Sequence, residues 1–403
     1  MSERNMIYLC LAHMSEEGAE QKYVKEAFDT NWVVPMGPNV NAFEQDLANM
    51  ANSKTDGSEP LDRKVVCLSA GTAAVHLALI ACGVKAGDEV LVQSFTFCAS
   101  SHPITYLGAK PVFVGSERDT WNMDPELLEK AIIDRKEATG EYPKAIIPVA
   151  LYGMPYDCEE IMAIAEKYNI PVIEDAAEGM GSRFDGQVLG TFGKYGVLSF
   201  NGNKMITTSG GGALICQNKE DANEIMWYAT QARDAYPYYQ HTAIGYNYRM
   251  SNICAGIGRG QMTVAQAHID HHKHVQALYE ELLADVEGVG NIAAVGEPVD
   301  DGFVQRFNAL VFDGEQTADQ RKQLLQPVFL QPHIVVIVQI VQAHHGNILH
   351  IPQQRHGQIC SDETGSTGNQ NRLPIQLDIF IQHGLIPFLG SFTLPYLYGY
   401  CAL

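Results

Sequence analysis

Three short segments combine residue types that could hold a phosphorylated cofactor, and the first is the turn at 69–74. It runs Ser69-Ala70-Gly71-Thr72 between an apolar run and a stretch with helical periodicity. Free amides at a helix N-terminus, a hydroxyl group and the helix dipole together bind anions. The alternative is a tight strand-to-helix turn in which Thr72 is only a cap. The turn has neither the lysine of a Walker loop nor the GxGxxG of a dinucleotide site, so it predicts another kind of phosphate site.

Two carboxylates, Glu174 and Asp175, lie near the end of the apolar run 170–176. In open α/β sheets, ligands bind at the carboxyl ends of the strands. A buried carboxylate there needs a partner, and a protonated pyridine nitrogen is a suitable one. The alternative is that Asp175 caps a helix.

The third segment, 198–214, holds Lys204 between a strand-like stretch and three consecutive glycines at 210–212. A lysine shielded from water can form an imine with an aldehyde, although most single lysines are solvated. Ser199 is close enough in the chain to add a hydroxyl to the same anion site. A phosphate turn, a strand-end aspartate and a lysine, in that order, match what pyridoxal phosphate requires.

The elements that position these residues alternate between short apolar runs and helical stretches over residues 64–220. This pattern predicts a mostly parallel sheet flanked by helices on both faces. The expected strands are 65–69, 89–93, 110–115, 144–153 and 170–176, and the expected helices are 71–83 (closed by Gly83), 125–132 and 158–169.

The length and composition are those of a globular protein with two domains. The 403 residues suggest a large domain at 1–290 and a smaller one at 291–403. A net charge of −20 argues against nucleic-acid and anionic-membrane partners. The N-terminal residues do not resemble a signal peptide, no run of about 20 apolar residues predicts a membrane span, and the nine cysteines lack disulfide or metal spacing, so we expect a cytoplasmic protein.

Two regions have unusual composition. His271, His272 and His274 could suggest a metal site, but histidines on a charged helix are more often solvated, and no metal is predicted. The stretch 326–403 has five charged residues against ten glutamines and six histidines. This loss of the amphipathic pattern favours a change of reading frame over a divergent, partly buried tail.

The sequence resembles the DegT/DnrJ/EryC1/StrS family of sugar-nucleotide aminotransferases, which have the aspartate-aminotransferase fold. The resemblance covers residues 5 to 315 and ends near residue 320. It is carried by VVPMGPNVNAFE, SAGTAAVHLAL, QSFTFCASSHPITYLGAKPVFV, LYGMPYDCEEI, EDAAEGMGSRFDGQVLGTFGKYGVLSFNGNKMITTSGGGAL and HTAIGYNYRMSNICAGIGRGQ. It implies an α/β protein of fold type I, with a large domain that binds pyridoxal phosphate and a smaller C-terminal α+β domain.

By this resemblance, Lys204 forms the Schiff base with the cofactor and moves the proton during transamination. Asp175 pairs with the pyridine nitrogen, and Gly71, Thr72 and Ser199 hold the phosphate.

Three further residues are assigned by the resemblance alone. Phe97 would stack on the cofactor ring, with core packing as the alternative. Asn247 would reach the phosphate in a neighbouring subunit, which implies a homodimer with shared active sites. Glu178 stands near the cofactor's phenolic oxygen, where many members have glutamine or histidine.

The EDAAE form, with SFNGNK and ITTSGGG, resembles the subgroup that aminates carbon 4 of a UDP-4-keto-6-deoxy-N-acetylhexosamine for surface glycans, with glutamate as donor. One alternative is a sugar dehydratase with the same cofactor, but in those enzymes histidine replaces the lysine at position 204. The others are a non-catalytic sugar-binding or defective homologue and, more remotely, a nicotinamide oxidoreductase.

Overall fold

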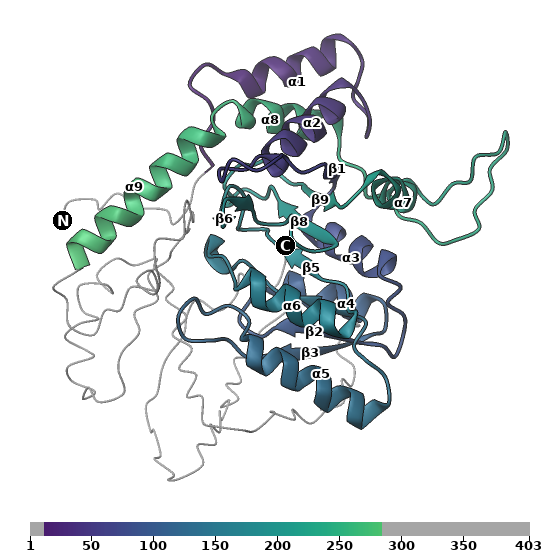
Figure 1. Cartoon of the computed structure of the whole chain (residues 1–403). Coiled ribbons are helices and arrows are strands. Elements are labelled where there is room, and N and C mark those ends of the chain that lie inside the picture. Colours follow the sequence, from purple (N-terminus) through teal and green to yellow (C-terminus); the bar gives the residue numbers. More distant parts are fainter. Residues whose placement is uncertain (1–11, 284–403) are drawn as a thin grey trace, which may run out of the picture. The chain divides into compact units, whose positions relative to one another are not determined.

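The computed structural model describes residues 12–283, which form one mixed sheet with helices on both of its faces (Figure 1). The strands of the sheet are β1 (Lys64–Leu68), β2 (Glu89–Gln93), β3 (Lys110–Val114), β4 (Ala145–Ile147), β5 (Ile173–Asp175), β8 (Tyr195–Ser199) and β9 (Gly212–Cys216). A short hairpin consists of β6 (Arg183–Phe184) and β7 (Gln187–Val188). The predicted boundary near residue 290 and the unusual stretch 326–403 lie outside the described residues.

The sheet has a four-stranded part, β1-β9-β8-β5, and a three-stranded part, β3-β2-β4. Parallel bridges between Ile146 and Val172 and between Val149 and Asp175 connect β4 to the β5 segment. The strand order is therefore β3-β2-β4-β5-β8-β9-β1. In this sheet β9 alone runs in the direction opposite to the other strands, so the predicted mostly parallel sheet is confirmed.

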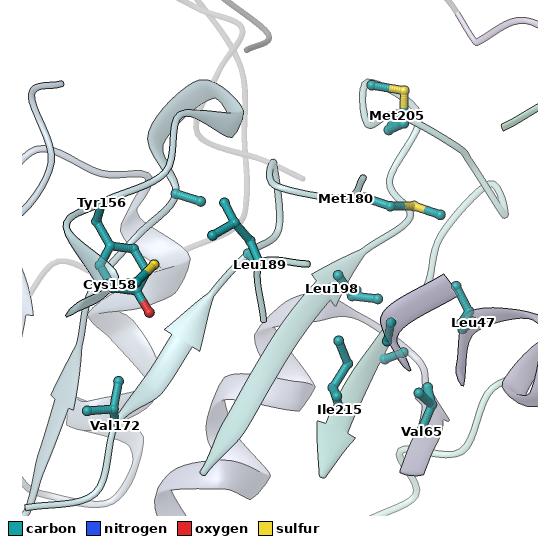
Figure 2. Close-up of a cluster of buried hydrophobic side chains, with 14 of the residues drawn as sticks. Leu47, Val65, Tyr156, Cys158, Val172, Met180, Leu189, Leu198, Met205 and Ile215 are labelled. Atoms are coloured by element: carbon teal, nitrogen blue, oxygen red, sulfur yellow. The ribbon is translucent and has the colours of Figure 1, made fainter. Parts of the chain in front are cut away.

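Consecutive residues of a strand belong to two different hydrophobic clusters. This alternation is the two-residue period expected of a sheet that is covered on both faces. Val65 and Leu198 belong to one cluster, with residues of α2, α5 and α6 (Figure 2). Their neighbours Val66 and Val197 belong to the other, with residues of α3 and α7.

The longer helices are α1 (Ala19–Asp29), α2 (Pro38–Asn52), α3 (Gly71–Ala81), α5 (Pro125–Thr139), α6 (Cys158–Tyr168), α7 (Lys219–Ala229), α8 (Asn252–Met262) and α9 (Ala265–Leu283). Shorter ones are α4 (His102–Tyr106), η1 (Cys98–Ser100) and η2 (Leu151–Gly153). No helix within residues 12–283 is long and apolar enough to cross a membrane.

Helix ends follow local residue chemistry. Asp124 accepts a hydrogen bond from Leu127 N at the start of α5, and Asp157 accepts one from Glu160 N at the start of α6. Gly83 has a φ of 76° directly after α3, as its predicted role in closing that helix requires.

The predicted strand 144–153 is too long. Pairing with β2 ends at Ile147, and one further bridge joins Val149 to Asp175. The chain then turns through η2, where Tyr152 has a left-handed backbone conformation with φ 53° and ψ 22°. Pro148 has no N–H for the ladder, and the left-handed residue bends the chain away from the strand direction. The apolar residues there are buried in the turn instead of a longer strand.

Candidate active site

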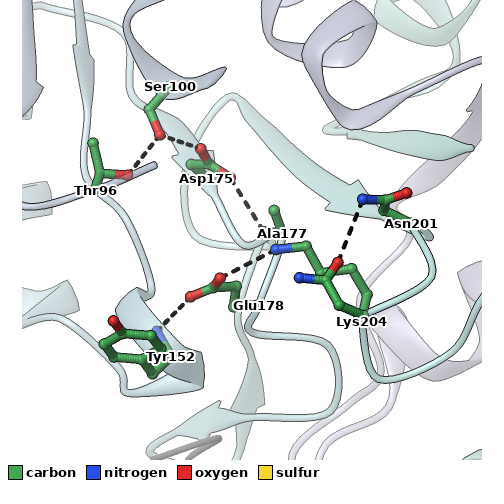
Figure 3. A network of polar contacts seen from close by, with 9 residues as sticks. Thr96, Ser100, Tyr152, Asp175, Ala177, Glu178, Asn201 and Lys204 are labelled. Carbon is green, nitrogen blue, oxygen red and sulfur yellow. Dashed lines mark hydrogen bonds and ion pairs between the residues drawn. The ribbon is translucent and has the colours of Figure 1, made fainter. Parts of the chain in front are cut away.

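Asp175, the last residue of β5, is a buried carboxylate with a side chain held on two sides (Figure 3). Ser100 Oγ donates a hydrogen bond to its Oδ2 at 2.6 Å, and Ala177 N donates to its Oδ1 at 3.2 Å. Burial raises the pKa of Asp175, and these hydrogen bonds and the charge of Lys204 oppose that effect only in part. An additional cation beside this carboxylate would therefore stabilise its ionised form.

Lys204 lies in the loop between β8 and β9, with its ammonium group close to Glu178 (Figure 3). Lys204 Nζ is 3.1 Å from Glu178 Oε1, and Glu178 Oε2 accepts a hydrogen bond from Tyr152 N at 2.7 Å. The Lys204 side chain is 12% exposed. The structure thus brings three of the predicted residues, Asp175, Glu178 and Lys204, into one cluster at the carboxyl end of β5.

The turn 69–74 starts α3 and lies against the end of β8. The N-cap residue, Ala70, is extended and provides no side-chain cap, so Thr72 is not the cap of this helix. A Cβ placed on Gly71 would lie 3.1 Å from Ser199 Cβ and 3.4 Å from Ser199 Oγ. The amides of the turn and the Ser199 hydroxyl can therefore contact one anion.

Phe97 and Asn247 have exposed side chains. Phe97 is 72% exposed, so the core-packing alternative is wrong, and it precedes η1, whose Ser100 contacts Asp175. The backbone of Asn247 forms a bridge with Thr230 on a segment that also contacts the phosphate turn, because Ser69 N donates to Tyr248 O at 2.8 Å. Ring stacking by Phe97 and a contact from Asn247 to a second subunit remain predictions.

Two contributors, Ser100 and the backbone of Tyr152, were not predicted. The hydroxyls in the segment after β2 were a usable signal, since the carboxyl ends of parallel strands meet at one edge. Nothing local in the sequence predicts that Tyr152 N contacts Glu178.

The cluster fits pyridoxal phosphate at three separate points. An uncapped helix start beside Ser199 suits the phosphate, Asp175 suits a protonated ring nitrogen, and the shielded Lys204 suits the aldehyde. Among residues 12–283, no group of three histidine, cysteine, aspartate or glutamate residues could hold a metal ion.

Comparison with known proteins agrees with this geometry. A model of the DegT/DnrJ/EryC1/StrS aminotransferase family matches residues 14–343. The chain belongs to this family. Membership of the DegT/DnrJ/EryC1/StrS family confirms the predicted fold type I and the predicted class of enzyme, a pyridoxal-phosphate-dependent aminotransferase.

Relatives within the DegT/DnrJ/EryC1/StrS family match more than two thirds of the chain. EpsN of Bacillus subtilis, which is named as a pyridoxal phosphate-dependent aminotransferase, is 45% identical over 283 residues, 70% of each chain. GDP-perosamine synthase of Escherichia coli O157:H7 is 34% identical over 319 residues, 79% of this chain and 81% of the relative. The crystal structure of a family aminotransferase from Brucella abortus has a TM-score of 0.65 at 28% identity, covering 72% of this chain and 74% of its own.

The predicted role of the turn 69–74 in phosphate binding can be tested at Gly212, the first residue of β9. A Cβ at Gly212 would overlap the backbone of Ala70 and the Gly71 nitrogen. Gly212→Ala should therefore displace the turn, lower the affinity for pyridoxal phosphate at least about tenfold and destabilise the fold by about 1–3 kcal/mol. Titration of the cofactor's visible absorption and thermal unfolding measure the two effects.

Gly210→Ala is the matched control, because a Cβ at Gly210 meets nothing within 4 Å. It should change stability by less than about 0.5 kcal/mol. Equal cofactor affinity in the two variants would show that the turn 69–74 does not bind the phosphate.

Proposed function

We propose that this chain transfers the amino group of glutamate to carbon 4 of a UDP-4-keto-6-deoxy-N-acetylhexosamine. The observation that most supports amino-group transfer is the cluster of Lys204, Asp175 and Glu178 at the end of β5. The sugar is supported by the subgroup resemblance of the segments around Glu178 and Lys204. GDP-perosamine synthase among the relatives supports a GDP-linked sugar as the second candidate.

Each residue of the cluster has a separate task. When bound, pyridoxal phosphate supplies an electron-withdrawing ring and an aldehyde carbon that carries the amino group between donor and acceptor. Lys204 Nζ would hold the cofactor at that carbon and, once displaced, would accept and return the proton that moves during transfer. Asp175 would hold a protonated ring nitrogen by its negative charge.

Glu178 and Ser199 orient the reacting groups. Glu178 Oε1 holds Lys204 Nζ at 3.1 Å, which limits the directions in which the amine can move its proton. Ser199 and the amides at the start of α3 would hold the phosphate end of the cofactor and so limit its movement relative to Lys204. The lysine also argues against the dehydratase alternative, which requires histidine at that position.

The substrate is tested by direct competition. The purified enzyme, with pyridoxal phosphate and glutamate, receives equal amounts of the UDP-linked and a GDP-linked 4-keto-6-deoxy sugar, and mass spectrometry follows the amino sugars formed. We expect the UDP-linked sugar to react at least about ten times faster, which corresponds to about 1.4 kcal/mol of discrimination. Faster reaction of the GDP-linked sugar would overturn the UDP assignment, and no reaction of either would overturn the sugar assignment.

We also propose a homodimer in which each active site uses residues of both subunits. The segment after α7 extends away from that helix as a long loop (Figure 1), and it exposes Tyr236, Tyr238, Tyr239 and Ile244. A group of large apolar side chains exposed in this way is typical of an interaction surface. The loop leads into Asn247, which the family resemblance places at a neighbouring subunit's phosphate.

Hybrid dimers test this arrangement. If Asn247 serves the partner's site, a dimer of one Lys204→Ala subunit and one Asn247→Ala subunit has one intact site and one doubly altered site. Mixing and reassembling the two variants in equal amounts should then give about a quarter of wild-type activity from the intact sites of the hybrid dimers, above the activity of either variant alone. If Asn247 serves its own subunit, no mixture should exceed the activity of Asn247→Ala alone.

A further inference from the structure

Two carboxamide side chains behind the cluster are completely buried and contact each other. Gln93, the last residue of β2, and Asn122 both have 0% exposure, and Gln93 Nε2 donates to Asn122 Oδ1 at 3.3 Å. Neither is among the partners of Lys204 and Asp175 described above, and neither has a role in the mechanism above. Buried amides require several hydrogen-bond partners, so the backbone groups that satisfy them are fixed in return.

Gln93 joins the segment that follows β2 to the segment that follows β4. Its Nε2 donates to Phe95 O at 2.9 Å, and its Oε1 accepts from Met123 N at 2.8 Å and from Val149 N at 3.3 Å. The first of these segments continues to Phe97 and Ser100, and Ser100 contacts Asp175. The Gln93 side chain therefore connects the segment after β2 to the segment after β4.

Asn122 forms hydrogen bonds to the backbone on both sides of Tyr152, the residue with the left-handed conformation. Its Oδ1 accepts from Leu151 N at 3.1 Å, and its Nδ2 donates to Met154 O at 2.9 Å. Between these two contacts, Tyr152 has a φ of 53°, a conformation that an aromatic residue rarely adopts. Such strain persists only where the surroundings fix it, and the N–H that it orients is the one that contacts Glu178.

We propose that Asn122, supported by Gln93, is a positioning residue: it holds Tyr152 in the left-handed conformation so that Tyr152 N fixes Glu178 and Glu178 fixes Lys204. The proposal rests on the function proposed above, because it assigns Lys204 as the group that moves the proton. The line of contacts runs from Asn122 to the 151–154 turn, then through Tyr152 N to Glu178 Oε2 and from Glu178 Oε1 to Lys204 Nζ.

The test begins with Asn122→Asp, which keeps the shape and the acceptor for Leu151 N but loses the donor to Met154 O. Wild-type protein must first show the visible band of lysine-bound pyridoxal phosphate, and its absence would refute the proposed function before the inference is tested. In the variant we expect the band to remain, kcat to fall at least about tenfold, and KM for glutamate to change less than about threefold. Asn49→Asp, at an exposed amide on α2, is the control and should match wild type.

A double-mutant cycle separates positioning from general support of the fold. Asparagine adopts left-handed conformations more readily than tyrosine, so Tyr152→Asn should make the turn less dependent on Asn122. We expect Asn122→Asp to lower kcat less than about threefold in the Tyr152→Asn background. An equal loss in both backgrounds, or an unchanged kcat in Asn122→Asp itself, would overturn the proposal.

Gln93→Glu keeps the inference testable if Asn122→Asp does not fold. The new carboxyl group retains the acceptor for Met123 N and Val149 N, and it can donate to Phe95 O only when it is protonated. The ratio of variant to wild-type kcat should therefore rise at least about fivefold as the pH is lowered from 8 to 6. A ratio that stays constant with pH would count against a positioning role for this pair.

Discussion

Replacing Lys204 with alanine is expected to abolish the visible absorption band formed with pyridoxal phosphate and to lower kcat at least about a thousandfold. General acid–base catalysis contributes about 10² to 10⁴ in rate, and this one amine also forms the covalent link to the cofactor. Its Nζ is held 3.1 Å from Glu178 in a largely shielded position, so the methyl group of alanine replaces no part of its function. Stopped assays of amino-sugar formation and absorption spectra of the same samples measure both effects.

The control for this substitution is Lys167→Ala. Lys167 is an exposed lysine that pairs with Glu129 at 2.6 Å, away from the cluster, and its loss should leave the band and kcat unchanged. Thermal unfolding should show that the Lys204→Ala protein is folded. Turnover of that folded protein at the wild-type rate would refute the assignment of Lys204.

Asp175→Asn is expected to affect activity and stability in opposite directions. Asparagine cannot hold the ring nitrogen protonated, so kcat should fall on the order of a hundredfold or more, the usual effect of removing one electrostatic contact to the reacting system. The cofactor-free protein should become more stable at neutral pH by about 1–2 kcal/mol, because a buried carboxylate is replaced by a neutral group of the same shape.

The sign of the pH dependence follows from burial. Burial raises the pKa of Asp175 above its value in the unfolded chain, so the folded state binds this proton more tightly. The contribution of Asp175 to stability is therefore fully present below the unfolded pKa, about 3.9, and is lost as the pH rises through the folded pKa. The stability advantage of Asp175→Asn should be large at pH 7 and shrink towards pH 4.

Chemical denaturation of the cofactor-free proteins at several pH values measures this difference. Ser100→Ala is the companion variant, since it removes one donor to Asp175 and leaves the carboxylate in place. It should lower the stability of the cofactor-free protein at neutral pH and reduce kcat less than Asp175→Asn does. An Asp175→Asn protein that is less stable than wild type at every pH would contradict the account of burial.

The order of the elements, Asp175 and Lys204 could be predicted from the residues themselves, because local chemistry indicates them, whereas Glu178 was assigned only by the family resemblance. Apolar runs indicated β1, β2, β3 and β5, and Gly83 ends the helix that begins at Gly71, as predicted. Asp175 was identifiable because a carboxylate that ends a buried strand of a parallel sheet lies at the ligand-binding edge.

The exact partners in the supporting contacts could not be predicted, because these contacts join residues that are far apart in the chain. Ser100 contacts Asp175 across 75 positions, and Asn122 reaches the turn around Tyr152 from about 30 positions away. The left-handed conformation of Tyr152 runs against the preference of its residue type, so only its surroundings can explain it. For the same reason the predicted strand at 144–153 was too long.

The central claim is tested most directly by the absorption spectrum of the purified protein with pyridoxal phosphate, recorded before and after addition of glutamate. The account predicts a visible band from the cofactor bound to Lys204, which glutamate converts to the near-ultraviolet band of the aminated cofactor with release of 2-oxoglutarate. A folded protein that forms no visible band, or a band that glutamate leaves unchanged, would contradict it.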